Sequence, residues 1–452
     1  MNILFITDLY PVKSDEKTTP RTLLAFVEEW GKMGHNVDVL KPNFILNSFL
    51  RGKPFYKSGQ YGDVFNINYW TPFWFDVKRN FNGNSRLGTL AQLNKHNYNI
   101  VVAHMPSGIL FADKLGLPFV AGIHNSDIEV LTNPLYKIHF KPRLEKALRN
   151  ARAIACRSFV LQDKLLKLYP EFENKVFVAP SGVDEKAIKQ LGSEAARLLD
   201  GKPIRHETDL DVKMQRCKEV KSNTELGKYA QPTEICNVNF VEEIDQNLSK
   251  RNEKHSADTN FSRFTSHISL SSDMNHSLLT THHSPIKVLT CAHFKKRKNI
   301  DKVIKACKGL ECFELTVIGD GKERKKLEKI DKNVIFTGRL PHDEVLAKMR
   351  NSDIFVLPSV GETFGMVYLE AMASGCITVC TKGDGIDGII KDRENGFLTE
   401  PNSESIKETL LNIKNLTKEE LNSLYTNSFN TIQHYTSTLC AERYLQQILK
   451  IM

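Results

Sequence analysis

The chain has 452 residues, of which 41% are hydrophobic and 25% charged, and its composition excludes a collagen-like or wholly disordered protein. This length is sufficient for two domains that each bury an apolar core. The formal net charge of +9 is compatible with anionic lipid, phosphorylated substrates or nucleic acid as partners. Because the sequence contains no zinc-finger or RNP motif, we do not expect nucleic acid, and we leave open generic solvated charge and a membrane-facing patch.

The sequence carries no signal for secretion or for a membrane span. No apolar run approaches the roughly 18 residues needed to cross a bilayer, and the first nine residues lack the features of a secretory signal. The nine cysteines are odd in number and form no C-x-x-C pair, so we expect reduced packing residues. We therefore expect a cytoplasmic protein, for which a peripheral position at the inner face of the plasma membrane is compatible with the charge.

The first 190 residues alternate short β-branched runs with helical patterns. A strand is expected over residues 3–7, a helix over 19–32 and further strands over 36–40, 99–104, 119–124, 151–156 and 175–179. Such alternation predicts parallel strands with helical crossovers, as in a Rossmann-like domain. The aromatic-rich stretch 55–81 fits a lipid interface, an acceptor-stacking site or a strand and loop of the core, and we favour the core.

The composition changes between residues 191 and 285, where Ser, Thr, Asn, His, Lys and Glu dominate and apolar periodicity disappears. We expect a disordered insertion without a packed core. Its histidines, Cys217 and Cys236 lack zinc-ligand spacing, so no metal site is expected there.

The same alternation resumes at residue 286. Strands are expected over 287–290, 314–318, 333–336, 353–357 and 377–380, and helices over 299–308, 342–350 and 365–374. We therefore expect an α/β protein with two doubly wound domains, 1–190 and 286–429, facing each other across a cleft, the first completed by a C-terminal helix at about 430–452. Ligands of such sheets bind at the carboxyl ends of the strands.

The stretch 361–375 reads GETFGMVYLEAMASG and follows the strand IFVLPS. Glu362 lies in the loop, and Glu370 lies about two turns later in the helix. The helix N-terminus presents backbone N–H groups suited to a diphosphate: those of Phe364, Gly365, Met366 and Val367. The two carboxylates are then expected to accept hydrogen bonds on either side of it, Glu362 from the sugar and Glu370 from the ribose. A helix-capping role for Glu362 and simple exposure of Glu370 are the structural alternatives.

This pattern resembles the family 4 retaining glycosyltransferases of GT-B fold, whose signature is two glutamates separated by seven residues. The resemblance extends over LTVIGDGKERKKLEK, VIFTGRLPHDEVLAKMRNSDIFVLPS, KGDGIDGII and ENGFLTEP, which together cover most of residues 286–401. The first half resembles the family's acceptor domain more loosely, because Ser181 replaces the usual Asn and the glycine-rich turn after the first strand is absent.

The resemblance implies roles for further residues. In the cationic run FKKRKN, Lys298 takes the position of the family's diphosphate lysine, while the usual arginine falls at His293, so that Arg297 or Lys296 is a candidate substitute. His124, at the end of the strand PFVAGIH, is a candidate contact to the sugar, with a core or capping histidine as the alternative. Gly338, Arg339 and Leu340 are expected to place backbone groups against the nucleobase.

The resemblance implies transfer of a hexose or N-acetylhexosamine from a nucleoside-diphosphate sugar, UDP-linked on family frequency, to a hydroxyl of a glycan or lipid-linked acceptor. It implies retention at the anomeric carbon, a place in bacterial surface polysaccharide or glycolipid synthesis, and no cofactor or metal ion. A GT-B sugar-nucleotide epimerase and a non-catalytic binding module are the alternatives.

Overall fold

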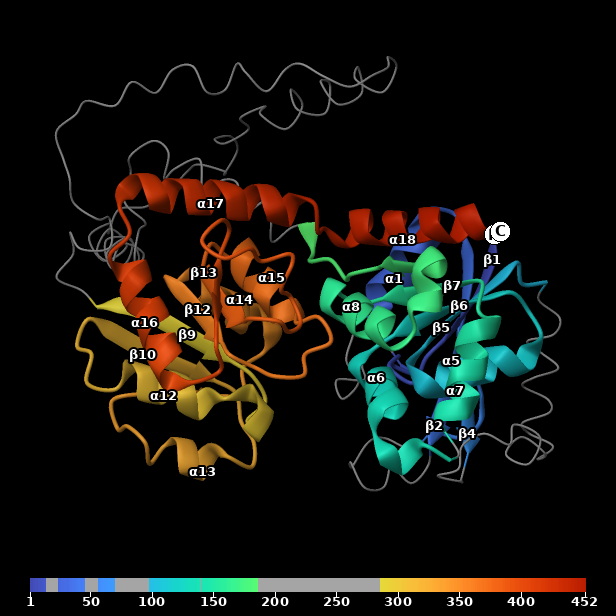
Figure 1. The fold of residues 1–452 in the computed structure, drawn as a ribbon, viewed down its shortest axis with the longest axis horizontal. Coiled ribbons are helices and arrows are strands. Elements are labelled where there is room, and N and C mark those ends of the chain that lie inside the picture. The colour runs from blue at the N-terminus through green and yellow to red at the C-terminus, as the bar shows by residue number, and fades with distance from the viewer. Residues whose placement is uncertain (14–22, 45–55, 70–96, 139, 186–284) are drawn as a thin grey trace, which may run out of the picture. The chain divides into compact units, whose positions relative to one another are not determined.

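A computed structural model describes residues 1–13, 23–44, 56–69, 97–138, 140–185 and 285–452 (Figure 1). The segment expected to be a disordered insertion and the aromatic residues of 70–81 lie outside these ranges. The described residues form two mainly parallel sheets with helices packed on them, which confirms the expected α/β fold class.

The first half contains an eight-stranded sheet in the order β3-β4-β2-β1-β5-β6-β7-β8. Its strands are β1 Asn2–Ile6, β2 Asn36–Phe44, β3 Gly59–Tyr61, β4 Val64–Tyr69, β5 Ile100–His104, β6 Phe119–Ile123, β7 Ala153–Cys156 and β8 Val176–Val178. All neighbours pair in parallel except β3 and β4, which form an antiparallel hairpin. Every strand expected in this half is present. Within the aromatic-rich stretch, β4 adds the buried side chains of Val64, Phe65 and Ile67 to the sheet, which agrees with the core interpretation for that part.

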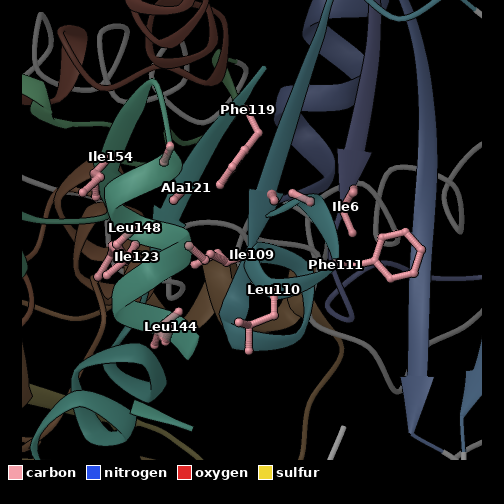
Figure 2. Packing of buried hydrophobic residues seen from close by; sticks show 14 of the residues in the cluster. Ile6, Ile109, Leu110, Phe111, Phe119, Ala121, Ile123, Leu144, Leu148 and Ile154 are labelled. Atoms are coloured by element: carbon pink, nitrogen blue, oxygen red, sulfur yellow. The ribbon is translucent and has the colours of Figure 1, made fainter. Parts of the chain in front are cut away.

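Helices cover both faces of this sheet. On one face lie α5 Met105–Leu115, α6 Asn125–Thr132, α7 Lys141–Asn150 and α8 Phe159–Leu168. Figure 2 shows how Ile109 and Leu110 of α5 and Leu144 and Leu148 of α7 pack with strand residues such as Ile123. Strand residues on this face point at every second position toward the helices, as the alternation of a pleated sheet requires.

The opposite face of the same sheet is covered by α1 Leu24–Lys32 and by the C-terminal helix α18 Ser437–Ile451. Trp30 of α1 is fully buried, and its indole N–H donates to the carbonyl of Ala441 at 2.8 Å. Tyr444 of α18 packs edge-on against both Trp30 and Phe26. The last helix of the chain thus lies in the core of the first half, beside α1 (Figure 1).

The second half contains a six-stranded parallel sheet in the order β11-β10-β9-β12-β13-β14. Its strands are β9 Ile286–Cys291, β10 Phe313–Ile318, β11 Ile335–Gly338, β12 Ile354–Leu357, β13 Ile377–Thr381 and β14 Phe397–Thr399. The main helices are α12 Ile300–Cys307, α13 Arg324–Leu327, α14 His342–Arg350, α15 Met366–Ala373, α16 Ser403–Lys414 and α17 Lys418–Gln433. The strands and helices expected here are present within one or two residues, and β14 is an addition.

Candidate functional site

The sheet order of the second half creates a switch point between β9 and β12. The chain leaves β9 toward β10 on one side and later enters β12 on the other, so the loops after these two strands open side by side. Several hydrogen bonds join the loops; among them, the Val360 N–H donates to the Arg297 carbonyl at 2.8 Å, and the Asn299 side chain donates to the Pro358 carbonyl at 2.8 Å. This edge of the sheet is the candidate donor site.

Glu362 is the centre of the site. Its Oε1 accepts hydrogen bonds from the Lys298 ammonium, from Arg297 Nη1 at 3.0 Å and from Ser359 Oγ at 2.7 Å. Lys298 and Glu362 are each only 14% exposed, whereas Arg297 is 45% exposed. The structure therefore brings together the loop glutamate and two of the candidate cations, although they are more than 60 residues apart in the sequence.

Burial and charge act on the pKa values of this cluster in different ways. Burial lowers the pKa of Lys298, and the neighbouring Glu362 offsets part of this effect. For Glu362, burial by itself raises the pKa, but Lys298, Ser359 and Arg297 together lower it below its ordinary value. Glu362 is therefore ionised at neutral pH and forms ion pairs with both Lys298 and Arg297.

Asp384, which sequence reasoning left without a role, fixes the loop that carries Glu362. Its carboxylate accepts the backbone N–H of Gly361 on Oδ2 and that of Glu362 on Oδ1, the second at 3.0 Å. The N–H of Gly385 also donates to Oδ1, at 2.8 Å, and the side chain is only 7% exposed. The motif KGDGIDGII, noted only for its resemblance, thus supplies an anionic clamp that shapes the Glu362 loop.

The helix α15 begins at this loop with the backbone expected for an anion site. Gly365 caps the helix with φ +90°, and a Cβ added there would lie 2.5 Å from the ring of Tyr368. Only glycine avoids both the unfavourable φ and the clash. Phe364 is buried in the core, while Met366 and Val367 are partly buried, so Phe364 can meet a ligand only through its backbone.

Glu370 lies on α15 and contacts a residue that the sequence did not single out. Its Oε1 is 3.1 Å from Nε2 of His342, the first residue of α14, and this hydrogen bond raises the pKa of His342. Glu370 is 23% exposed and His342 64%. Burial raises the pKa of the Cys291 thiol to about 12, with a further increase from Glu370 and a decrease from Lys298. Glu370 and Lys298 thus both act on the pKa of a side chain at the end of β9, so both lie at the same edge of the sheet.

The other candidate donor residues lie on neighbouring loops of that edge. His293 and Arg339 are exposed, and Leu340 is partly buried against the core around α15. Gly338 ends β11 with φ +75°, and its carbonyl accepts the Gly319 N–H at 2.8 Å. The roles of these residues in ligand binding stay predictions.

His124 directly follows β6 and is the N-cap residue of α6, where its backbone N–H donates to Asp127 at 2.7 Å. Its ring is 6% exposed, and Nε2 lies 3.1 Å from Nδ1 of the fully buried His104. His104 Nε2 in turn lies 3.3 Å from the hydroxyl of Tyr444. Burial and the charge of Arg157 lower the pKa of His124 to about 3. These contacts are those of the alternative interpretation, a core and capping histidine, and a catalytic role stays a prediction.

Neither a metal site nor a membrane span is found in the part of the chain that the structure describes. Within those ranges, no three His, Cys, Asp or Glu side chains are grouped so that they could hold a metal ion. The helices described there are all too short or too polar to cross a bilayer.

Comparison with known proteins defines the class to which this fold and site belong. Over its full length the chain resembles the solved structure of Anabaena HepE in complex with UDP and glucose, with a TM-score of 0.58 and 14% identity over 100% of both chains. That likeness establishes the GT-B fold, of two Rossmann-like domains.

Two family models then match the two halves. Glycosyltransferase Family 4 matches residues 20–187, and Glycosyl transferases group 1 matches residues 277–430. The chain belongs to the family 4, group 1 glycosyltransferases.

Curated relatives are similar over part of their length. An uncharacterized glycosyltransferase of Methanocaldococcus jannaschii is 38% identical over 134 residues, 28% of this chain and 37% of the relative. A lipopolysaccharide core biosynthesis glycosyltransferase of Rhizobium meliloti is 31% identical over 117 residues, 25% of this chain and 34% of the relative. The matched segment thus spans about a third of the length of these relatives.

Proposed function

We propose that the protein transfers a hexose or N-acetylhexosamine from a UDP-sugar to an acceptor hydroxyl, with retention at the anomeric carbon. The observation that carries the proposal is the cluster of Glu362, Lys298 and Arg297 beside the N-terminus of α15. Cations and unpaired helix N–H groups at one sheet edge suit a diphosphate, and the adjacent carboxylate suits sugar hydroxyls.

In this reaction the bond between the anomeric carbon and the diphosphate oxygen breaks first. Lys298 and the α15 N-terminus stabilise the negative charge that develops on the departing diphosphate. The acceptor oxygen attacks the anomeric carbon from the same face, and its proton passes to the leaving phosphate oxygen. This route requires neither a protein base nor a metal ion, which accords with the buried, neutral state of His124.

The proposed donor nucleotide and the proposed acceptor rest on similarity to known proteins. HepE was solved with UDP and glucose, which supports a uridine donor. The relative from Rhizobium meliloti is named for lipopolysaccharide core synthesis, which supports a glycan or lipid-linked acceptor at a membrane surface.

A screen of the purified protein against UDP-, GDP- and ADP-sugars tests the proposal, because a bound donor stabilises the fold by mass action even without an acceptor. We expect thermal stabilisation and slow hydrolysis with one or a few UDP-sugars. Release of an epimerised sugar nucleotide would identify an epimerase. Stabilisation without turnover, in the presence of membrane glycolipid extracts as acceptors, would identify a binding module.

Lys298→Ala tests the charge stabilisation. Turnover should fall about a hundredfold or more, and further than donor affinity does, because the value of the cation grows as the diphosphate departs. Addition of EDTA to the unmodified protein should change turnover little. Loss of transfer with EDTA, restoration by Mg²⁺ or Mn²⁺ and an active Lys298→Ala variant would together overturn the metal-free mechanism.

A further inference from the structure

The turn between α6 and α7 exposes two large apolar side chains. Leu135 is 87% exposed and Ile138 is 80% exposed, more than any other exposed large hydrophobic among the described residues. Leu135 lies in the short 3-10 helix Pro134–Tyr136, and Ile138 follows it by three residues. Both side chains therefore lie at the solvent-exposed surface of the turn, three residues apart in the sequence.

The turn is ordered by its own hydrogen bonds. The Asn133 side chain accepts the Leu135 N–H at 3.0 Å, and the Tyr136 N–H donates to the Asn133 carbonyl at 3.0 Å. The Tyr136 ring turns inward and packs edge-on against the buried Phe140, with ring centroids 5.5 Å apart. The inward position of Tyr136 therefore leaves Leu135 and Ile138 pointing away from the core, and this exposure is a fixed feature of the fold.

Several cations lie close to these two side chains in the sequence. From residue 133 to residue 152 the sequence holds six lysines and arginines against a single acid, Glu145. Helix α7 buries Leu144, Ala147 and Leu148 and exposes Arg143 and Lys146 on its other side. Within the described residues no ion pair involves Lys137, Arg143 or Lys146, whereas the nearby Lys141 lies 3.9 Å from Glu145.

We propose that Leu135, Ile138 and the cations Lys137, Arg143 and Lys146 form a docking surface for a membrane rich in anionic lipid. Apolar side chains at the tip of an ordered turn can enter the interfacial region, while the basic rim is attracted to acidic headgroups. Two aliphatic side chains form too small an apolar patch for a stable protein interface, which removes about 800 Å² from each partner. Among the described residues of the turn, Tyr136 is half-buried and Phe140 is buried, so neither offers an exposed aromatic ring for stacking on a nucleic-acid base.

The docking surface specifies which part of the chain would contact the membrane at which the proposed acceptor lies. The observations that support the docking surface do not depend on the proposed transfer reaction. It lies on the first half, and none of its residues belongs to the candidate donor site. Membrane binding and donor binding can therefore be measured separately, and either can fail without the other.

Co-sedimentation of the full chain with phosphatidylcholine vesicles, with and without about 30% phosphatidylglycerol, tests the proposal. We expect binding to the anionic vesicles only, and its loss at high salt. The double variants Leu135→Ser with Ile138→Ser, and Lys137→Glu with Arg143→Glu, should each weaken binding about tenfold or more. Their melting temperatures and UDP binding should stay unchanged.

Matched controls come from surfaces elsewhere on the chain. Leu449→Ser removes an apolar side chain that is 51% exposed on α18, and Lys325→Glu with Lys329→Glu reverses two exposed cations of the second half. Both should bind vesicles as the unmodified protein does. Equal weakening in the controls, or no binding of the unmodified protein, would overturn the proposal. One further result would also overturn the proposal. If the double variant Leu135→Ser with Ile138→Ser changed the protein from a dimer to a monomer and left vesicle binding unchanged, the surface would be a protein interface.

Discussion

Asp384→Asn tests whether the anionic clamp on the Glu362 loop sets recognition of the donor sugar. The carboxylate accepts three backbone N–H groups, from Gly361, Glu362 and Gly385. An asparagine amide has one oxygen and one NH2 group, so in either orientation at least one of these N–H groups faces another donor. The change is nearly isosteric, and its effect comes from hydrogen bonding and charge.

The magnitude follows from the bonds that are lost. Loss of one charge-assisted hydrogen bond at a buried site costs about 1.5–3 kcal/mol. Because the clamp holds the loop and not the helix, we expect affinity for the UDP-sugar to fall about tenfold while affinity for UDP falls less than about threefold. The free energy of unfolding of the second half should decrease by about 2 kcal/mol, which lowers the melting temperature by a few degrees.

Isothermal titration of UDP and of the UDP-sugar found in the screen measures the two affinities. Asp387→Asn is the matched control, because Asp387 belongs to the same loop and accepts the N–H of Gly383 without touching the Glu362 loop. It should leave the preference for UDP-sugar over UDP unchanged. If Asp384→Asn weakens UDP and UDP-sugar equally, or behaves as the control does, Asp384 is a structural residue only and the reasoning is refuted.

Three further predictions concern Glu370, His342 and His124. Glu370→Gln should lower UDP affinity about tenfold, with or without the sugar, because the ribose bonds weaken; unchanged UDP affinity by titration would remove Glu370 from the site. The pKa of His342 is raised by Glu370, so its contribution to stability is present below about pH 6.5 and is lost as the pH rises through the raised pKa. The melting temperature should therefore fall less between about pH 6 and pH 8.5 in His342→Gln than in the unmodified protein. The difference should correspond to less than about 1 kcal/mol, because the His342 side chain is largely exposed. Identical pH profiles of the two proteins would contradict this. The pKa of His124 is lowered to about 3, so the unfolded chain takes up a proton below about pH 6.5 while the folded chain does not. Acidification to about pH 5 should then cost about 2 kcal/mol of unfolding free energy through this residue, and His124→Gln should show a shallower acid limb in urea denaturation than the unmodified protein.

The sequence by itself was sufficient to predict most of the described strands and helices and the residues at the centre of the candidate donor site. The spacing of apolar residues has a period of two in strands and 3.6 in helices, so elements such as β12 and α15 could be located from local pattern alone. The loop with Glu362 and the cationic run with Lys298 each follow a predicted strand. Since parallel strands end at the same sheet edge, the meeting of these two residues was accessible from the sequence.

The tertiary structure alone decided which distant groups complete the site. The clamp between Asp384 and the Gly361 N–H depends on where β13 lies relative to β12, and the contact between Glu370 and His342 depends on how α14 packs on α15. The ring of His104 meets Tyr444 across 340 positions of sequence. Hydrogen bonds of this kind are fixed by sheet order and helix packing, for which local periodicity carries no signal. For the same reason the sequence pattern around Leu135 did not distinguish a buried apolar residue from an exposed one, because the inward turn of Tyr136 onto Phe140 is a property of the folded chain.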